Sequence, residues 1–287
     1  MLSKVIPIVF AAVLWHTDAA PVKYGSNPAA GKTFTHEGVK LYYEVYGTGQ
    51  PVLLIHGNGG SIATMTAQII YFQKRYQVIA MDSRDQGKSA DSPDNITYEK
   101  MADDLAALLD HLKSPPVYAL GWSDGGIEAL LLGIRHPEKV KKIASMAANL
   151  NPQGVYPDTE ELGKLLSNSI PASAKDSPEA KRQMKVSQMT LDEPHIAPEA
   201  LEAITAPTLV MASDHDLIRD EHTLEIYHHI PNSQLCIFPN ATHMIPIDDP
   251  ELFNSTVDRF FRTPFVKKDR IKDLIKTVQK MMAASKN

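Results

Sequence analysis

A Gly-Trp-Ser-Asp-Gly stretch at residues 121–125 most constrains the fold of this chain. It directly follows a short apolar run, residues 117–120, and opens a segment of helical character, residues 127–132. Between a strand and a helix, a G-x-S-x-G pattern indicates a turn so tight that there is almost no room for side chains two positions before and after the serine. Such a turn projects the Ser123 hydroxyl above a sheet. By itself the pattern is weak, because an ordinary surface turn can produce it, and the flanking segments strengthen it.

Short, nearly continuous apolar runs recur along the chain, and segments with helical spacing separate them. The runs are residues 52–55, 78–81, 117–120, 143–146, 209–211 and 235–238. Aliphatic runs of this length, without strict alternation, are typical of strands buried on both faces. Residues 41–46 alternate instead, which predicts an early, half-exposed antiparallel strand. The pattern predicts an α/β fold with a mostly parallel central sheet and helices on both faces.

The N-terminal residues predict a signal peptide over residues 1–20. Lys4 precedes an unbroken apolar run at 5–15, and small residues follow at 19–20. The run is too short for a stable membrane span, which needs about 20 apolar residues. The alternative, a buried N-terminal helix, is disfavoured because Pro7 lies inside the run. We therefore expect a secreted or periplasmic protein.

The strand–helix alternation is interrupted once. Residues 150–205 contain polar helical pieces punctuated by proline, which predicts a small helical cap inserted into a core formed by residues 39–149 and 206–264. A pair of ordinary crossover helices is the alternative, but the segment is longer than one crossover needs. Residues 21–38 form a lead-in to the core.

Residues 265–287 predict an amphipathic C-terminal helix. Its apolar side chains recur at helical spacing on one face, and lysines occupy the rest. They are Ile271, Leu274, Ile275, Val278, Met281 and Met282. We expect this face to dock on the domain, although contact with an anionic membrane or a partner is an alternative.

Composition argues against nucleic-acid binding, an internal disulfide and a metal site. The net charge of -5 and the pI near 6.1 provide no basic surface for nucleic acid. Cys236 is the only cysteine, so no internal disulfide is expected. No metal-ligand spacing stands out, and the sequence does not indicate an oligomeric state.

A serine nucleophile requires a base that takes its proton and an acid that orients the base. Asp216 follows the apolar run at 209–211, and His243 follows the run at 235–238. Because the carboxyl ends of parallel strands meet at one edge of a sheet, Ser123, Asp216 and His243 are expected to converge there. Their order along the chain is Ser, Asp, His.

A glycine-rich turn at residues 57–60 follows another strand end. Two backbone N–H groups aimed at a developing oxyanion can stabilise it, and the amides of Asn58 and Asp124 are the candidates. The alternative, a phosphate-binding loop, is weaker because no Lys followed by Ser or Thr comes after the glycines.

Taken together, these motifs resemble the α/β-hydrolase fold family over residues 39–261. Residues 82–89 are similar to the family's D-x-R-G-x-G-x-S stretch, except that Asp85 stands where the family has glycine, which puts the backbone at that position in question. The elbow sequence is similar to that of valacyclovirase-like members, which hydrolyse amino-acid esters. The resemblance assigns the catalytic acid to Asp216 and leaves Asp214 as its solvated or loop-stabilising neighbour.

Two residues near these motifs have competing interpretations. We expect His56 to hydrogen-bond within its loop rather than to act in catalysis. Asp124 either binds an ammonium group of the substrate or simply occupies the first turn of a helix, where the macrodipole favours an acid. The helix interpretation is preferred.

The sequence therefore predicts a serine hydrolase that cleaves small to medium carboxylic esters through an acyl-enzyme and needs no cofactor. Its partner is a small-molecule ester-type substrate. The same triad also serves C–C bond hydrolases, lactonases, amidases and perhydrolases, and a ligand receptor can retain it.

Overall fold

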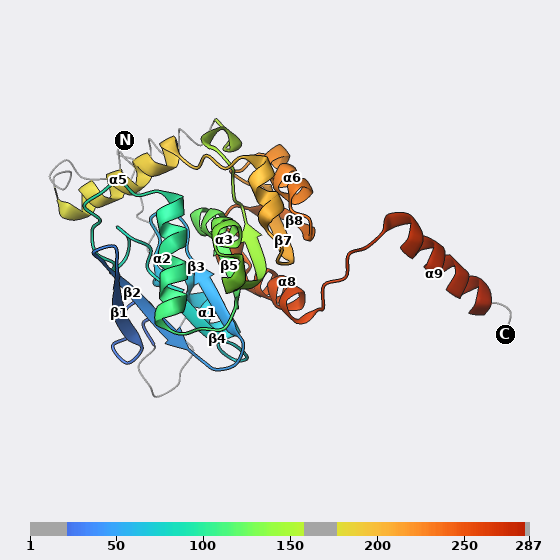
Figure 1. Cartoon of the computed structure of the whole chain (residues 1–287), viewed down its shortest axis with the longest axis horizontal. Coiled ribbons are helices and arrows are strands. Elements are labelled where there is room, and N and C mark those ends of the chain that lie inside the picture. The colour runs from blue at the N-terminus through green and yellow to red at the C-terminus, as the bar shows by residue number, and fades with distance from the viewer. Residues whose placement is uncertain (1–21, 158–176, 285–287) are drawn as a thin grey trace, which may run out of the picture.

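The computed structural model describes residues 22–157 and 177–284, and its centre is an eight-stranded sheet (Figure 1). The strands are β1 (Gly31–His36), β2 (Val39–Tyr46), β3 (Pro51–Ile55), β4 (Gln77–Met81), β5 (Val117–Trp122), β6 (Val140–Met146), β7 (Thr208–His215) and β8 (Ser233–Thr242). They lie in the order β1-β2-β4-β3-β5-β6-β7-β8. The β1–β2 and β2–β4 pairs are antiparallel and all others are parallel. The predicted mostly parallel α/β sheet is confirmed.

The six apolar runs of the sequence are the strands β3 to β8. In β3 every residue is buried, as expected for a strand covered on both faces. The sequence did not indicate β1, where only Phe34 is buried. An edge strand with one buried side chain has neither an apolar run nor a clear alternation.

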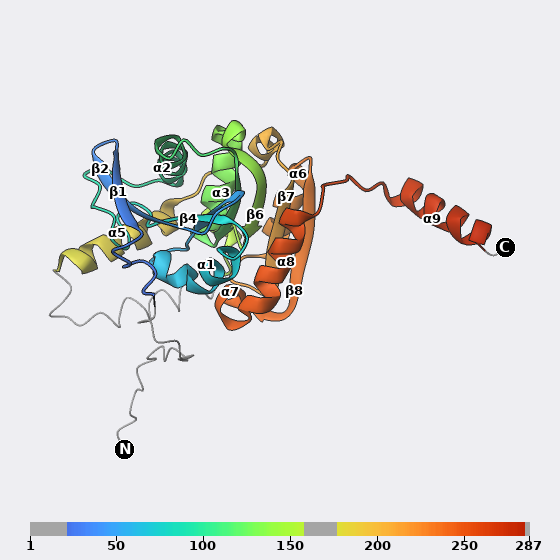
Figure 2. The ribbon, with the colours of Figure 1, turned by 90° about the horizontal axis from the view of Figure 1, so that it is seen from below.

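Helices cover both faces of the sheet (Figure 2). On one face lie α2 (Tyr98–His111), α3 (Asp124–Arg135) and α6 (Asp220–His229), which pack into one hydrophobic cluster. On the other lie α1 (Thr66–Phe72) and α8 (Pro250–Arg262), which pack into a second cluster. The short α7 (Ile245–Asp248) precedes α8, and 3-10 helices occur at Ile62–Met65, Pro137–Lys139, Pro152–Gly154 and Pro198–Ala203.

The predicted cap lies between β6 and β7. Its described helix is α5 (Pro178–Asp192), which begins where the Ser177 hydroxyl accepts the Ala180 N–H. Val186 and Met189 of α5 are buried in the first hydrophobic cluster. Residues 158–176 lie outside the described residues, as do residues 1–20, so the extent of the cap and the signal peptide stay predictions.

The C-terminal helix forms, but its predicted docking is wrong. The helix α9 (Arg270–Ala284) extends away from the body after an extended segment, residues 263–269 (Figure 1). The exposed fraction of its large apolar side chains ranges from 44% for Val278 to 68% for Met281. Amphipathicity shows that a helix has an apolar face, but not which surface covers it. None of the helices within residues 22–157 and 177–284 combines the length and apolar character that crossing a bilayer requires.

Lys142 of β6 is a buried cation that holds the end of α8. Its Nζ donates hydrogen bonds to the carbonyls of Phe260, Phe261 and Thr263 at 2.7, 3.0 and 2.6 Å. The last carbonyls of a helix have no intrahelical donor, and a cation is favourable there. The side chain is 8% exposed, so water does not replace these bonds readily.

We expect Lys142→Met to lower the free energy of unfolding by about 2–4 kcal/mol, because it leaves three carbonyls without their charged donor. Urea denaturation measures this. The matched control is Lys141→Met, since Lys141 is exposed, and its Nζ contacts the Gln50 side chain at 3.1 Å and lies 5.7 Å from the centroid of the Tyr118 ring. Its effect should be within about 0.5 kcal/mol. Equal effects of the two substitutions would contradict the assignment.

Candidate active site

Ser123 lies on the tight turn between β5 and α3. Its φ of 58° and ψ of −123° place it in a conformation that L residues rarely adopt. A Cβ added to Gly121 would lie 1.8 Å from the Gly125 carbonyl oxygen, and one added to Gly125 would lie 2.2 Å from the Ile55 oxygen. The steric requirement inferred from the sequence is confirmed, and it presses the start of α3 against the end of β3.

His243 and Asp216 are in direct contact at the carboxyl ends of β8 and β7. The His243 Nδ1 lies 2.7 Å from Asp216 Oδ1, and the Asp216 side chain is fully buried. Asp216 also accepts the backbone N–H groups of Leu217 at 2.8 Å and Ser213 at 3.1 Å. These bonds fix the carboxylate and orient the imidazole. With Nδ1 donating to Asp216, Nε2 is the ring nitrogen that can accept a proton.

Asp214 has a different role from Asp216. It accepts the N–H groups of Ala241 and Asn240 at 3.0 and 2.7 Å and contacts the His215 ring at 2.9 Å. These backbone hydrogen bonds, with that of His215, hold the pKa of the exposed Asp214 carboxyl well below its usual range. Asp214 therefore ties the end of β8, just before His243, to the end of β7.

Trp122 connects the loop that carries His243 to the turn that carries Ser123. Its indole Nε1 donates to the His243 carbonyl at 2.9 Å, and the two ring centroids are 5.9 Å apart. Because Trp122 immediately precedes Ser123, this bond joins the loop after β8 to the elbow. The sequence alone did not assign Trp122 a role, since the middle position of G-x-S-x-G carries no fixed requirement.

The glycine-rich turn after β3 lies against Ser123. A Cβ added to Gly57 would be 3.1 Å from the Ser123 Cβ and 3.7 Å from its Oγ. Next along the turn, the Asn58 side-chain amide donates to the Asp124 carboxylate at 2.9 Å. Asp124 is the first residue of α3, where backbone N–H groups lack an intrahelical acceptor. The two backbone amides proposed for an oxyanion therefore belong to residues whose side chains are in direct contact.

His56 supports this turn from inside the protein. Its Nδ1 lies 2.8 Å from the Gly57 carbonyl, and its Nε2 accepts the Ser83 N–H at 3.0 Å. Burial lowers the pKa of the His56 imidazole, which favours the neutral ring that both bonds require. The prediction that His56 hydrogen-bonds locally is confirmed.

Asp124 is enclosed by protein groups. Its carboxylate accepts hydrogen bonds from Asn58 and from the Tyr98 hydroxyl, and the residue is 6% exposed. Burial raises the pKa of Asp124 and, one turn later, raises that of Glu128 well above its usual value, where the neighbouring Asp124 adds to the effect. Sequence reasoning missed Tyr98 and Glu128, although a glutamate within the apolar face of α3 was a signal.

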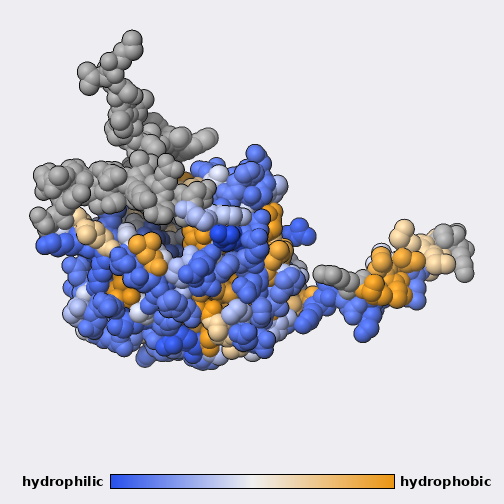
Figure 3. Space-filling view, turned by 90° about the horizontal axis from the view of Figure 1, so that it is seen from above, coloured by the Kyte–Doolittle hydropathy of each residue, from blue (hydrophilic) through white to orange (hydrophobic). Residues whose placement is uncertain are grey.

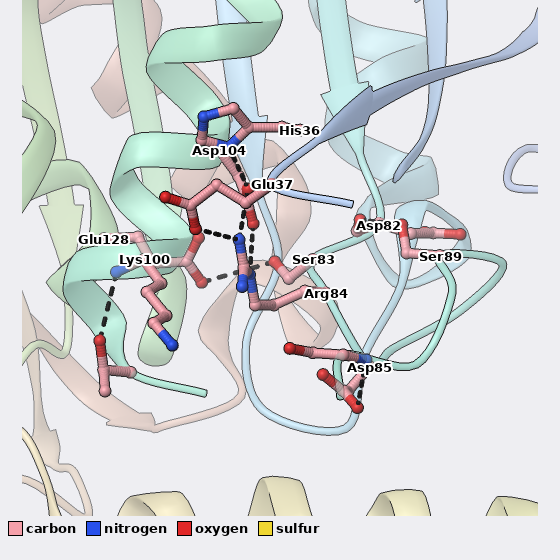
Figure 4. Close-up of polar contacts among 12 residues, drawn as sticks. His36, Glu37, Asp82, Ser83, Arg84, Asp85, Ser89, Lys100, Asp104 and Glu128 are labelled. Atoms are coloured by element: carbon pink, nitrogen blue, oxygen red, sulfur yellow. Dashed lines mark hydrogen bonds and ion pairs between the residues drawn. The ribbon is translucent and has the colours of Figure 1, made fainter. Parts of the chain in front are cut away.

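Polar side chains of the loop after β4 contact neighbouring elements (Figure 4). Arg84 is 2% exposed and makes two hydrogen bonds to Asp104 of α2, at 2.6 and 2.7 Å. Asp104 also contacts His36 of β1 at 2.8 Å. From the same loop, the Ser83 hydroxyl points toward Glu128 at 3.5 Å. The loop thus connects β1, α2 and α3.

Asp85 stands where the family has glycine, and its backbone still adopts the left-handed conformation that glycine favours. Its φ is 61°, in the left-handed region. The Asp85 carboxylate accepts the Ser92 N–H at 3.1 Å and lies 3.0 Å from Lys185 Nζ of α5. The question that the sequence raised is answered: the conformation is retained, and the side chain connects the loop to the cap helix.

Comparisons with known proteins agree with this geometry. A family model described as alpha/beta hydrolase fold matches residues 50–167. The 3-oxoadipate enol-lactonase 2 of Acinetobacter baylyi is 27% identical over 256 residues, covering 79% of this chain and 94% of the relative. The serine hydrolase BPHL of Mus musculus is 26% identical over 268 residues, covering 85% and 90%.

Among solved structures, Est816, described as an N-acyl homoserine lactone degrading enzyme, superposes with a TM-score of 0.68 at 25% identity, covering 80% of this chain and all of that one. The strand order, the elbow and these similarities all indicate the same fold. This chain therefore has the α/β-hydrolase fold.

Proposed function

We propose that this protein is a serine hydrolase that cleaves small to medium carboxylic esters, with Ser123 as nucleophile, His243 as base and Asp216 as orienting acid. The observation that carries the proposal is the 2.7 Å contact between His243 and a fully buried Asp216. A buried carboxylate that already accepts backbone N–H groups is suited to hold an imidazole in one tautomer.

In the proposed reaction, His243 Nε2 takes the Ser123 proton while Oγ attacks the ester carbonyl carbon. The amides of Asn58 and Asp124 stabilise the oxyanion. Collapse of the tetrahedral intermediate breaks the bond to the alcohol, which leaves with the proton from His243. Water then attacks the acyl-enzyme with His243 again as base, and Ser123 regains its proton as the acid departs.

Lactone opening is the second candidate. Two relatives point to it by their names: an enol-lactonase and an N-acyl homoserine lactone degrading enzyme. A lactone is a cyclic ester, so the same acyl-enzyme steps apply, and the alcohol stays attached to the acyl group. The same residues also serve C–C bond, amide and peracid chemistry in this fold.

We expect turnover of p-nitrophenyl acetate, butyrate and octanoate, of an aminoacyl ester or of a simple lactone, each followed by product release. Ser123→Ala should lower kcat by about 10⁴-fold or more, and Asp216→Asn by about 10³- to 10⁴-fold, because each removes a member of the proposed triad. Steady-state kinetics with active-site titration measures both.

Asp214→Asn is the control for these variants, because it removes the same charge two residues away. Its effect should be less than about tenfold. Equal, negligible rates for the wild type and Ser123→Ala would contradict the proposal. Covalent labelling of Ser123 without repeated turnover would indicate a receptor instead.

The contacts of Asp124 lead to a prediction about amine recognition. Because its carboxylate is hydrogen-bonded to Asn58 and Tyr98, we expect Asp124→Asn to reduce kcat/KM on an amino-acid ester and on the matching acyl ester by factors within about threefold of each other. The measurement compares the two substrates on both proteins. A loss confined to the amino-acid ester would show that Asp124 binds the ammonium group.

We also propose that residues 1–20 direct export. When the whole chain is expressed in a bacterial host, we expect the exported protein to begin at Ala20 or Pro21, after cleavage behind Ala19 or Ala20. Charges in the apolar run, as in Val9→Arg with Val13→Arg, should keep the chain in the cytoplasm with its first residues intact. Mass spectrometry of the N-terminus decides this, and an uncleaved wild type that stays cytoplasmic argues against export.

A further inference from the structure

The α9 helix presents an apolar stripe that none of the other described residues, 22–157 and 177–269, covers. We define the α9 stripe as Ile271, Leu274, Ile275, Val278 and Met281, whose side chains are 44–68% exposed. Their spacing of three and four residues places them along one side of the helix. Figure 3 shows this apolar surface on the arm that extends from the body.

Lysines occupy the opposite side of the helix. Lys272, Lys276 and Lys280 recur every four residues, which at 100° per residue places them about half a turn from the α9 stripe. Between residues 267 and 280 the sequence has six Lys or Arg and two Asp, a net charge of +4, whereas the whole chain carries -5. The arm is therefore a cationic amphipathic element on an acidic protein.

The helix has local supports but is short. The Asp269 carboxylate accepts the N–H groups of Ile271 and Lys272 at its start, at 3.1 and 2.9 Å. A helix of 15 residues is nevertheless marginal in water without tertiary contacts. A surface that covers the α9 stripe would supply the missing stabilisation.

A second copy of the chain offers little to cover the stripe. Among the described residues, the body's exposed large apolar side chains lie at most two to an element, as with Leu235 and Ile237 of β8. Pairing of two α9 helices would give a coiled coil of about two heptads, whereas stable ones need three or four. Neither arrangement matches a stripe that runs the length of the helix.

We propose that α9 binds an anionic phospholipid membrane, lying in its surface with the α9 stripe in the boundary between headgroups and acyl chains. A helix with one apolar face and a lysine-rich polar face binds in this way, and anionic headgroups attract its charge. The segment 263–269 connects α9 to the body, where Lys267 Nζ donates to the Pro231 carbonyl at 3.0 Å. The helix thus tethers the hydrolase to the surface without spanning the bilayer.

The test is co-sedimentation of the full chain with sucrose-loaded vesicles of phosphatidylcholine, alone or with one quarter phosphatidylglycerol. We expect binding to the phosphatidylglycerol vesicles that weakens with added salt. Leu274→Gln with Val278→Gln should reduce the partition coefficient at least about tenfold, since two stripe side chains no longer enter the bilayer. All variants share the same N-terminal residues, so a difference between them belongs to α9.

The matched control is Thr277→Gln with Ala283→Gln, which places two glutamines on α9 outside the stripe and leaves the charge unchanged. It should bind within about twofold of the wild type. Equal binding by the two double variants, or no binding by the wild type, would overturn the proposal. So would a dimer in sedimentation velocity that Leu274→Gln with Val278→Gln abolishes, since a second copy would then cover the stripe. Unchanged ester turnover in solution verifies that each variant is folded.

Discussion

The close packing of backbone at the elbow is the constraint on which the site depends. Gly121 and Gly125 allow the start of α3 to approach the Ile55 carbonyl of β3 to a distance that any Cβ would prevent. The same approach brings Gly57 beside the Ser123 hydroxyl. The proposed nucleophile and the proposed oxyanion donors therefore follow two neighbouring parallel strands, β5 and β3, and the backbone rather than adjustable side chains sets their separation.

Buried polar side chains hold the surrounding loops against this centre. The Arg84–Asp104 pair fixes the loop after β4 to α2, and Lys142 fixes the end of α8 to β6. A buried charge is costly unless its hydrogen bonds are made, and the bonds of both side chains are made only in the native arrangement. The loops at the carboxyl edge are therefore held in place before a substrate arrives, which is what preorganised oxyanion donors require.

The sequence predicted what depends on local pattern. Apolar runs identified β3 to β8, and the ends of these strands located Ser123, Asp216 and His243. The sequence did not predict strand β1, because this strand buries only Phe34. The hydroxyl of Tyr98 near Asp124 and the Lys185 contact with Asp85 could not be foreseen, because they join residues 26 and 100 positions apart through the folded chain. For α9 the sequence pattern predicted the helix and its apolar face. The pattern could not predict which surface covers that face, because it contains no information on the packing partner.

The α5 helix contacts the glycine-rich turn at residues 57–60, which carries a proposed oxyanion donor. Substrate choice and catalysis are therefore expected to be coupled. The Asn58 side chain donates to Asp124 at 2.9 Å and also reaches the Val186 carbonyl of α5 at 3.4 Å. One residue before Val186, Lys185 contacts both Asp85 and the Ser92 carbonyl. A shift of α5 to admit a larger acyl group would therefore strain the contacts of Asn58, whose backbone amide is a proposed oxyanion donor. If α5 borders the proposed acyl site, acyl preference should appear in kcat as well as in KM, because α5 also contacts Asn58, whose amide is proposed to act in the transition state.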